Sequence, residues 1–148
     1  ELFVLMFFGW IAVLGTVFVQ LGSWPWQGWL LGTQVGLLSA VLISINNIRD
    51  REEDAGTGKN TLAVKWGKKA AVSLLCVMTF GAYILGALWL INDSLWLALL
   101  PLVALPLGLK IVSRVSKEEA GPHFNKYLAL SALQLILFAG LWSVAMLV

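Results

Sequence analysis

The sequence predicts an all-α, polytopic membrane protein with five transmembrane helices. Of its 148 residues, 59% are hydrophobic and only 12% are charged, against about 25% charged residues in an ordinary soluble domain. The chain contains five long apolar stretches, and its basic residues gather in two of the connections between them. A soluble domain of this size has too little interior to bury so much apolar surface. The composition therefore excludes a nucleic-acid-binding module, a disordered chain and a disulfide-stapled secreted domain.

The five expected spans are, in order, residues 2–21, 29–45, 70–91, 95–112 and 127–148. About 20 apolar residues in a helix cross the ~30 Å hydrocarbon layer, and the first, third and fifth stretches reach this length. The second spans if its flanking turns contribute. The fourth is short and contains Pro101 and Pro106. Since membrane helices tolerate proline as a kink, we expect a bent fourth span.

The distribution of charge supports this count. Residues 46–69 hold six basic residues and residues 110–126 hold the other four, whereas residues 22–28 hold no charge and residues 92–94 hold only Asp93. With five spans, all ten basic residues lie on one side of the membrane, which the positive-inside rule makes the cytoplasmic side. We expect cytoplasmic loops at 46–69 and 113–126 of an integral membrane protein.

The whole chain, residues 1–148, is interpreted as a single membrane-embedded fragment. It begins at Glu1 without a Met. A signal peptide has a basic segment before its apolar stretch, and none precedes the first apolar stretch here. We therefore expect it to derive from a longer protein whose N-terminal helices are its partners.

The expected spans carry residues that are typical of helix packing and of the membrane interface. In the second span a small residue recurs at every fourth position, which lets helix backbones approach closely in lipid: Gly28, Gly32, Gly36, Ala40 and Ser44. Six tryptophans lie near the uncharged ends of the spans, where indole rings anchor proteins in lipid: Trp24, Trp26, Trp29, Trp89, Trp96 and Trp142. We expect the side-chain amides of Gln20, Gln34 and Gln134 to form hydrogen bonds between helices. His123 is interpreted as a surface residue.

A polar segment directly after the second span carries the candidate chemistry. If the helix continues to Asp54, then Asn46, Asp50 and Asp54 lie at about 0°, 40° and 80° around its axis. Asn47 and Glu53 fall at about 100° and −20°. Five oxygen-bearing side chains would then share one face of the helix at the membrane surface. Such a cluster suits a hard cation.

Mg²⁺ is the cation that this pattern favours, because proteins hold it with one or two carboxylates together with substrate phosphates. A diphosphate alone would be repelled by the carboxylates, but with Mg²⁺ between them the same carboxylates become its anchors. Arg49, Arg51, Lys59 and Lys65 are the candidates to bind its outer oxygens. An apolar chamber beside this site indicates a lipid-tailed diphosphate. The alternative interpretation is a solvated polar loop that only obeys the positive-inside rule.

The string NNIRDREEDAGTGKNTLAV, at Asn46–Val64, resembles the second aspartate-rich motif of the UbiA superfamily of intramembrane prenyltransferases. The paired asparagines, Arg49-Asp50, Gly58-Lys59 and Thr61–Val64 carry the resemblance, which extends over essentially the whole chain. The family has nine membrane helices with this motif after the sixth. The resemblance therefore implies that the five spans are helices 5–9 of that bundle.

The resemblance also implies a reaction: Mg²⁺-dependent transfer of a polyprenyl group from polyprenyl diphosphate to an aromatic carbon, with loss of a ring carboxylate. The implied acceptor is 1,4-dihydroxy-2-naphthoate of menaquinone biosynthesis, with hydroxybenzoate or homogentisate as alternatives. Asp50 and Asp54 would be the catalytic metal ligands together with Asn46, and Asn46, Asn47, Arg49 and Lys59 would bind the diphosphate. Asn60 stands where an arginine is common in the family.

The first aspartate-rich motif of the family is absent from these residues, as are four helices, so we expect them to be inactive on their own. Two other functions remain open. A transporter or channel component would use the acidic cluster as an entry vestibule, although such carriers commonly place ionisable groups inside their spans. A membrane scaffold would leave the acidic face without a purpose.

Overall fold

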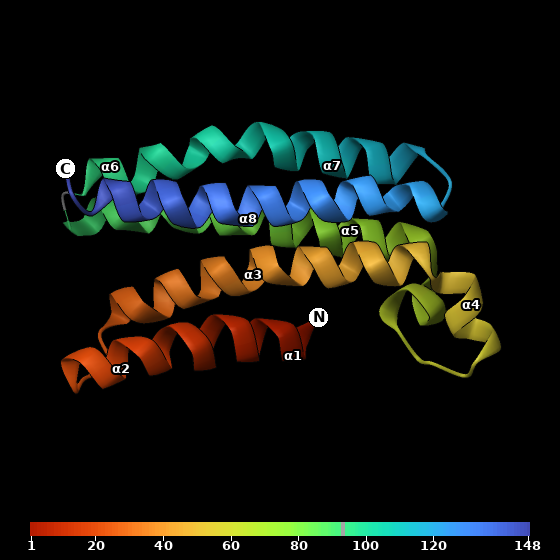
Figure 1. Cartoon of the computed structure of the whole chain (residues 1–148), viewed down its shortest axis with the longest axis horizontal. Coiled ribbons are helices and arrows are strands. Elements are labelled where there is room, and N and C mark those ends of the chain that lie inside the picture. The colour runs from red at the N-terminus through yellow and green to blue at the C-terminus, as the bar shows by residue number, and fades with distance from the viewer. Residues whose placement is uncertain (93) are drawn as a thin grey trace.

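The computed structural model describes residues 1–92 and 94–148, and these residues form a bundle of helices without a strand (Figure 1). Asp93 lies outside the described residues. Five helical segments are long and apolar enough to cross a membrane: Leu2–Leu21, Trp26–Arg49, Leu62–Ile91, Leu95–Lys117 and Pro122–Ala145. The predicted all-α class and the five spans are confirmed, and the chain is an integral membrane protein.

The first segment is one continuous rod made of α1 (Leu2–Val4), a π-helical stretch (Leu5–Leu14) and α2 (Gly15–Leu21). It ends at Gly22, whose φ of 65° lies in the left-handed region that favours glycine at a helix terminus. The chain then reverses, and α3 (Trp26–Arg49) runs back beside the rod (Figure 1).

Glycines bring these two segments into backbone contact. A Cβ atom added to Gly9 would lie 2.3 Å from the carbonyl oxygen of Gly32 and 2.8 Å from the Cα of Gly36. A Cβ added to Gly36 would lie 2.8 Å from the carbonyl oxygen of Leu5. The packing role predicted for the small-residue stripe is confirmed at Gly32 and Gly36, and Gly9 is the partner that the sequence alone did not identify.

The next two segments are the kinked ones. Helix α5 (Leu62–Leu85) bends at Gly67, which has a φ of 79°, and continues as a 3₁₀ helix over Gly86–Asn92. The fourth segment consists of α6 (Leu95–Leu99), a 3₁₀ turn (Leu100–Ala104) that contains Pro101, and α7 (Leu105–Lys117). The expected bent span is therefore present, and the 3₁₀ turn at Pro101 is where its helix changes geometry. A short turn (Pro122–Phe124) leads into α8 (Asn125–Ala145).

The helices extend beyond the apolar stretches from which the spans were predicted. Helix α3 continues to Arg49 where the predicted span ends at residue 45, and α5 begins at Leu62 where the predicted span begins at residue 70. Hydropathy detects only the part of a helix that contacts hydrocarbon, whereas the backbone hydrogen bonds continue into the polar interface. Much of the predicted loop 46–69 is consequently helical.

Buried amides join the helices. The Gln34 side-chain N–H donates to the carbonyl oxygen of Ala82 (2.8 Å), and that of Gln134 donates to the Tyr83 hydroxyl (2.9 Å). The interpretation of these two glutamines as bonds between helices is confirmed, whereas Gln20 is exposed. Trp89 is a correction: it is only 3% exposed and its indole N–H donates to Gln34 (2.9 Å), so it is a core residue and not a lipid anchor.

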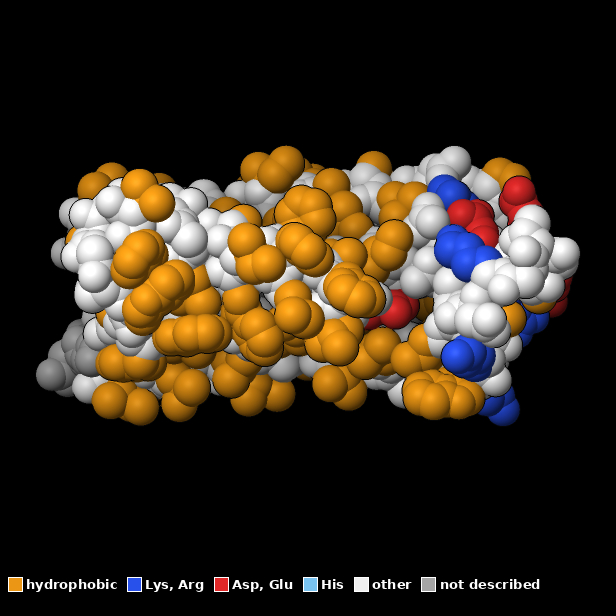
Figure 2. Space-filling model, turned by 90° about the horizontal axis from the view of Figure 1, so that it is seen from below, with side chains coloured by type: hydrophobic (Ala, Val, Ile, Leu, Met, Phe, Trp, Pro, Cys, Tyr) orange, Lys and Arg blue, Asp and Glu red, His pale blue; other side chains and the backbone are white. Residues whose placement is uncertain are grey.

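The two ends of the bundle differ in chemistry. Hydrophobic side chains cover most of the visible length, and the charged side chains gather mainly at the end that carries α4 (Arg51–Gly56) (Figure 2). All ten basic residues belong to the end of α3, to α4, to the connection after α4, to the start of α5, to the second half of the fourth segment or to the start of α8. Trp24, Trp26, Trp29 and Trp96 belong to the opposite end and are 43–54% exposed. The end that carries α4 and the basic residues is called the charged end below.

The close approach at Gly9 yields a stability prediction. We expect Gly9→Ala in the whole protein to lower the free energy of unfolding by about 1–3 kcal/mol, because the added methyl group meets backbone atoms that cannot move aside without separating the helices. The measurement is thermal unfolding in detergent. Gly15→Ala is the control, since nothing lies within 4 Å of a Cβ at that position. Equal melting temperatures for the two variants would contradict the packing account.

Candidate functional site

The candidate site begins where α3 ends. Asp50 has φ −92° and ψ 8° and separates α3 from α4, although the amide of Asp50 still donates to the carbonyl of Asn46 (2.9 Å). The uninterrupted helix expected up to Asp54 is therefore broken at Asp50. Helix α4 runs in a different direction from α3 (Figure 1). Asp50 and Asp54 take different hydrogen-bond partners, although the charge of Lys59 acts on both carboxylates.

Asp50 forms a two-point ion pair with Arg49. The guanidinium Nε lies 2.6 Å from Oδ1, and Nη2 lies 2.7 Å from Oδ2. The same guanidinium donates to the side-chain oxygen of Asn46 (2.8 Å) and to that of Asn125, at the start of α8. Arg49 is thus held from three directions, and it links the end of α3 to the last helix.

This pairing controls the protonation of Asp50. The hydrogen bonds and charge of Arg49 hold the pKa of the Asp50 carboxyl below its ordinary value, against the opposing effect of partial burial. A lowered pKa means that the pair contributes stability above the ordinary aspartate pKa of about 3.9 and loses it as the pH falls through the lowered value. Asp50 is consequently anionic throughout the neutral range.

Asp54 has its own cation. Asp54 is only 7% exposed. The Lys59 ammonium lies 3.1 Å from Oδ1 and 3.0 Å from Oδ2 of the Asp54 carboxylate. The turn that brings Lys59 back includes Gly58, with a φ of 77° that favours glycine. The Thr57 hydroxyl and the Lys59 amide both donate to the carbonyl of Asp54 (3.1 and 3.0 Å). A tight turn therefore closes the lysine over the carboxylate.

The other predicted site residues lie apart from these pairs. Asn47 is buried and donates to the Glu1 carboxylate (3.0 Å), so it joins α3 to the first segment. The Arg51 guanidinium lies 3.8 Å from Glu52, and Lys65 is exposed. Hydrogen bonds join Asn46, Arg49 and Asp50 in one group and Asp54 and Lys59 in another, and the charge of Lys59 also acts on Asp50.

Asn125 is a member of the cluster that the sequence reading missed. It lies 76 positions from Arg49 in the chain, so no local pattern connects the two residues. The only available signal was topological: with five spans, the connection that contains Asn125 faces the same side as the polar segment after α3. Glu1, the partner of Asn47, was missed for the same reason.

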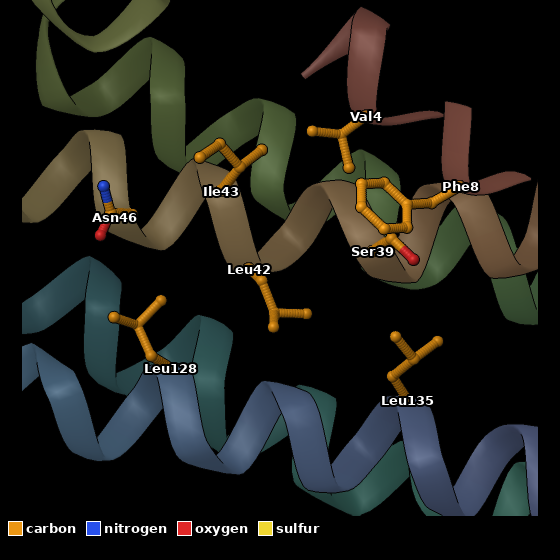
Figure 3. Close-up of a pocket in the computed structure, with 8 residues that line it drawn as sticks. All are labelled: Val4, Phe8, Ser39, Leu42, Ile43, Asn46, Leu128 and Leu135. Atoms are coloured by element: carbon orange, nitrogen blue, oxygen red, sulfur yellow. The ribbon is translucent and has the colours of Figure 1, made fainter. Parts of the chain in front are cut away.

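An apolar groove runs along the bundle to this cluster (Figure 3). Its volume is about 460 Å³, and it lies between the first segment, α3 and α8. The lining side chains are Val4, Phe8, Ser39, Leu42, Ile43, Asn46, Leu128 and Leu135. Asn46 is its polar member at the charged end, and the same amide accepts a hydrogen bond from Arg49. A ligand in the groove would therefore contact hydrocarbon along its length and the paired charges at one end.

The Asp50 and Asp54 carboxylates could hold part of the coordination shell of a Mg²⁺ ion. Anionic oxygens are the ligands that Mg²⁺ prefers, and Asp50 and Asp54 provide them within one turn of helix. Among the described residues no three His, Cys, Asp or Glu side chains converge on one point. The Asn46 oxygen, the third expected ligand, is occupied by Arg49. Two carboxylates do not complete a six-ligand shell, so a Mg²⁺ ion held here would need further ligands from a substrate phosphate or from other residues.

Comparison with known proteins gave matches over most of the chain. The profile of the UbiA prenyltransferase family matches residues 1–136. A protein of Mycobacterium leprae named 1,4-dihydroxy-2-naphthoate octaprenyltransferase is 32% identical over 94% of this chain and 47% of its own length. Its namesake in Escherichia coli is 35% identical over 80% of this chain and 39% of its own length.

A more distant relative carries a different name. The 2-carboxy-1,4-naphthoquinone phytyltransferase of Synechocystis is 23% identical over 95% of this chain and 46% of its own length. The chain therefore spans about half the length, or less, of these relatives. No solved structure gave a significant match.

Proposed function

Because the chain belongs to the UbiA prenyltransferase family, we propose that the whole protein transfers a polyprenyl group from polyprenyl diphosphate to an aromatic acceptor. The names of the relatives support a dihydroxynaphthoate acceptor and a place in menaquinone biosynthesis. Hydroxybenzoate and homogentisate are the alternative acceptors. The transfer requires Mg²⁺ in this proposal, and the charged end faces the cytoplasm of a bacterial inner membrane, as the positive-inside rule favours.

One observation carries the proposal: the apolar groove ends at Asn46, beside the paired charges of Arg49 and Asp50. A polyprenyl diphosphate has the same division, with a long hydrocarbon tail and an anionic head. Its tail would bury apolar surface against Leu42, Ile43 and the leucines of α8. Its head would then lie where ionised side chains are available.

The proposed ligands exchange partners when the donor binds. Without substrate, Arg49 neutralises Asp50 and Lys59 neutralises Asp54. Mg²⁺, when bound, would neutralise the diphosphate and stabilise it as a leaving group. Asp50 and Asp54 would hold the metal, which releases Arg49 and Lys59 to bind diphosphate oxygens. Asn46 and Asn125, which already contact Arg49, would keep its guanidinium beside the head group.

The chemistry that follows is a substitution at the allylic carbon of the donor. The carbon–oxygen bond breaks and its electron pair leaves with the diphosphate, while an aromatic ring carbon forms the new carbon–carbon bond. With a dihydroxynaphthoate acceptor, the ring carboxylate leaves as carbon dioxide and its electron pair restores the aromatic ring. The apolar groove would exclude water, which otherwise competes for the electron-deficient carbon. The rest of the site, including the first aspartate-rich motif of the family, would come from the part of the protein beyond these residues.

The ligand assignment predicts a loss of transfer in two variants. In the whole protein, Asp50→Asn and Asp54→Asn should each lower Mg²⁺-dependent transfer to a dihydroxynaphthoate by roughly 100-fold or more, because an amide oxygen binds the metal far more weakly than a carboxylate. The assay follows prenylated product with a panel of aromatic acceptors. Glu52→Gln is the matched control, since this nearby side chain is 94% exposed and should leave turnover unchanged. Full turnover in both aspartate variants would refute the assignment.

The groove predicts an effect on donor length. Ser39 lines the groove midway along α3 and its hydroxyl donates to the Val35 carbonyl (2.8 Å). We expect Ser39→Phe to block long polyprenyl diphosphates several-fold more strongly than geranyl diphosphate, measured as kcat/KM for each donor. Ser73→Phe is the control, because Ser73 makes the same bond to Lys69 (3.1 Å) on an exposed face of α5. An equal loss for short and long donors would contradict a tail in this groove.

A further inference from the structure

We propose that a groove between α7 and α8 binds the anionic headgroup of a membrane phospholipid. This groove has a volume of about 560 Å³ and lies at the charged end of the bundle. Lys110 and Arg114 of α7 and Lys126 of α8 line its polar part, and Leu130 and Leu133 line its apolar part. The proposal does not depend on the proposed transferase reaction, which uses another surface of the chain.

The polar part carries a net positive charge. Glu118 lies 3.6 Å from both Arg114 and Lys126, at ion-pair distance, and is one carboxylate for two cations. Glu118 also accepts a hydrogen bond from the buried Tyr127 hydroxyl (2.6 Å) and lies 3.3 Å from His123. One carboxylate is therefore shared among several donors. Within the described residues Lys110 has no ion pair, so three cations line the groove against the single carboxylate of Glu118.

The cations are held in place and remain accessible. The Lys126 ammonium lies 4.7 Å from the centre of the Tyr127 ring, a cation–π distance, while its side chain is 55% exposed. The Arg114 side chain is 60% exposed. Lys110 and Arg114 are one helical turn apart, about 6 Å along α7. An anion at this position can contact cations of both helices without displacing a buried contact.

The apolar part gives the groove the division of a phospholipid. Leu133 lies seven residues beyond Lys126 on α8, about 10 Å toward the middle of the bundle. Basic pockets between transmembrane helices at the membrane interface are a recurring mode of anionic lipid recognition. A free phosphate ion would use only the cations, whereas a phospholipid would also cover Leu130 and Leu133 with an acyl chain. The combination of cations and leucines in one groove favours a phospholipid over a free anion.

The lipid groove and the substrate groove occupy different faces of α8. Leu128 and Leu135 point into the groove of the candidate site (Figure 3). Lys126 and Leu133 lie about 140–160° away from Leu128 around the helix axis. An occupant of one groove therefore does not fill the other.

The test is lipid binding to the delipidated whole protein in a neutral detergent, followed by native mass spectrometry. Wild-type protein should bind phosphatidylglycerol more tightly than phosphatidylcholine with the same acyl chains. Lys110→Gln/Lys126→Gln should weaken phosphatidylglycerol binding by about 10-fold or more, because each cation near an anionic headgroup contributes to binding. Lys69→Gln/Lys117→Gln removes the same charge outside the groove and should leave that binding unchanged. Lys110→Arg/Lys126→Arg should retain it.

Three results would overturn the proposal. An equal loss in both glutamine variants would indicate a response to net charge and no site in this groove. Equal binding of the two lipids to wild-type protein would show that the headgroup charge is not recognised. Displacement of phosphatidylglycerol by millimolar inorganic phosphate would assign the cations to a free anion. Loss confined to Lys110→Gln/Lys126→Gln, with retention in the arginine variant, would support the lipid.

Discussion

The cost of placing an ionised side chain in hydrocarbon organises this molecule. The apolar middle of every membrane span is free of charge, so all ten basic residues and most of the acidic ones are confined to one end. A protein that acts on a lipid-tailed anion needs this arrangement, because the tail must lie among apolar helices while the head reaches charge. The groove that ends at Asn46 has both features, with apolar walls from the first segment, α3 and α8 and a polar side chain at its charged end.

At the charged end, Asp50 and Asp54 each form an ion pair with a basic residue. Arg49 contacts both oxygens of Asp50, and Lys59 contacts both oxygens of Asp54. An unpaired carboxylate as buried as Asp54 would be costly, so the lysine stabilises the folded loop in the absence of substrate. The same pairs would provide both kinds of group that a metal–diphosphate complex requires, two carboxylates for the metal and two cations for the phosphates. Stability and the proposed function thus use the same four side chains.

Roles that follow from hydropathy, spacing or residue type were predictable from the sequence, whereas the particular partners that distant helices bring together were not. The five spans, the glycine stripe of α3 and the amide bonds of Gln34 and Gln134 follow from hydropathy, spacing and the scarcity of polar partners in a membrane. The break at Asp50 did not, because the i, i+4 spacing is the same on either side of it. The contact of Asn125 with Arg49 and the burial of Trp89 also arise only when the helices pack.

The exchange of partners at Asp50 and Asp54 is the central claim, and an experimental structure of the whole protein with Mg²⁺ and a non-reactive polyprenyl diphosphate analogue tests it most directly. The account predicts metal density in contact with both carboxylates, the diphosphate beside Arg49 and Lys59, and the tail along Leu42 and Leu135. A diphosphate bound elsewhere, with Arg49 still closed on Asp50 and Lys59 on Asp54, would contradict it.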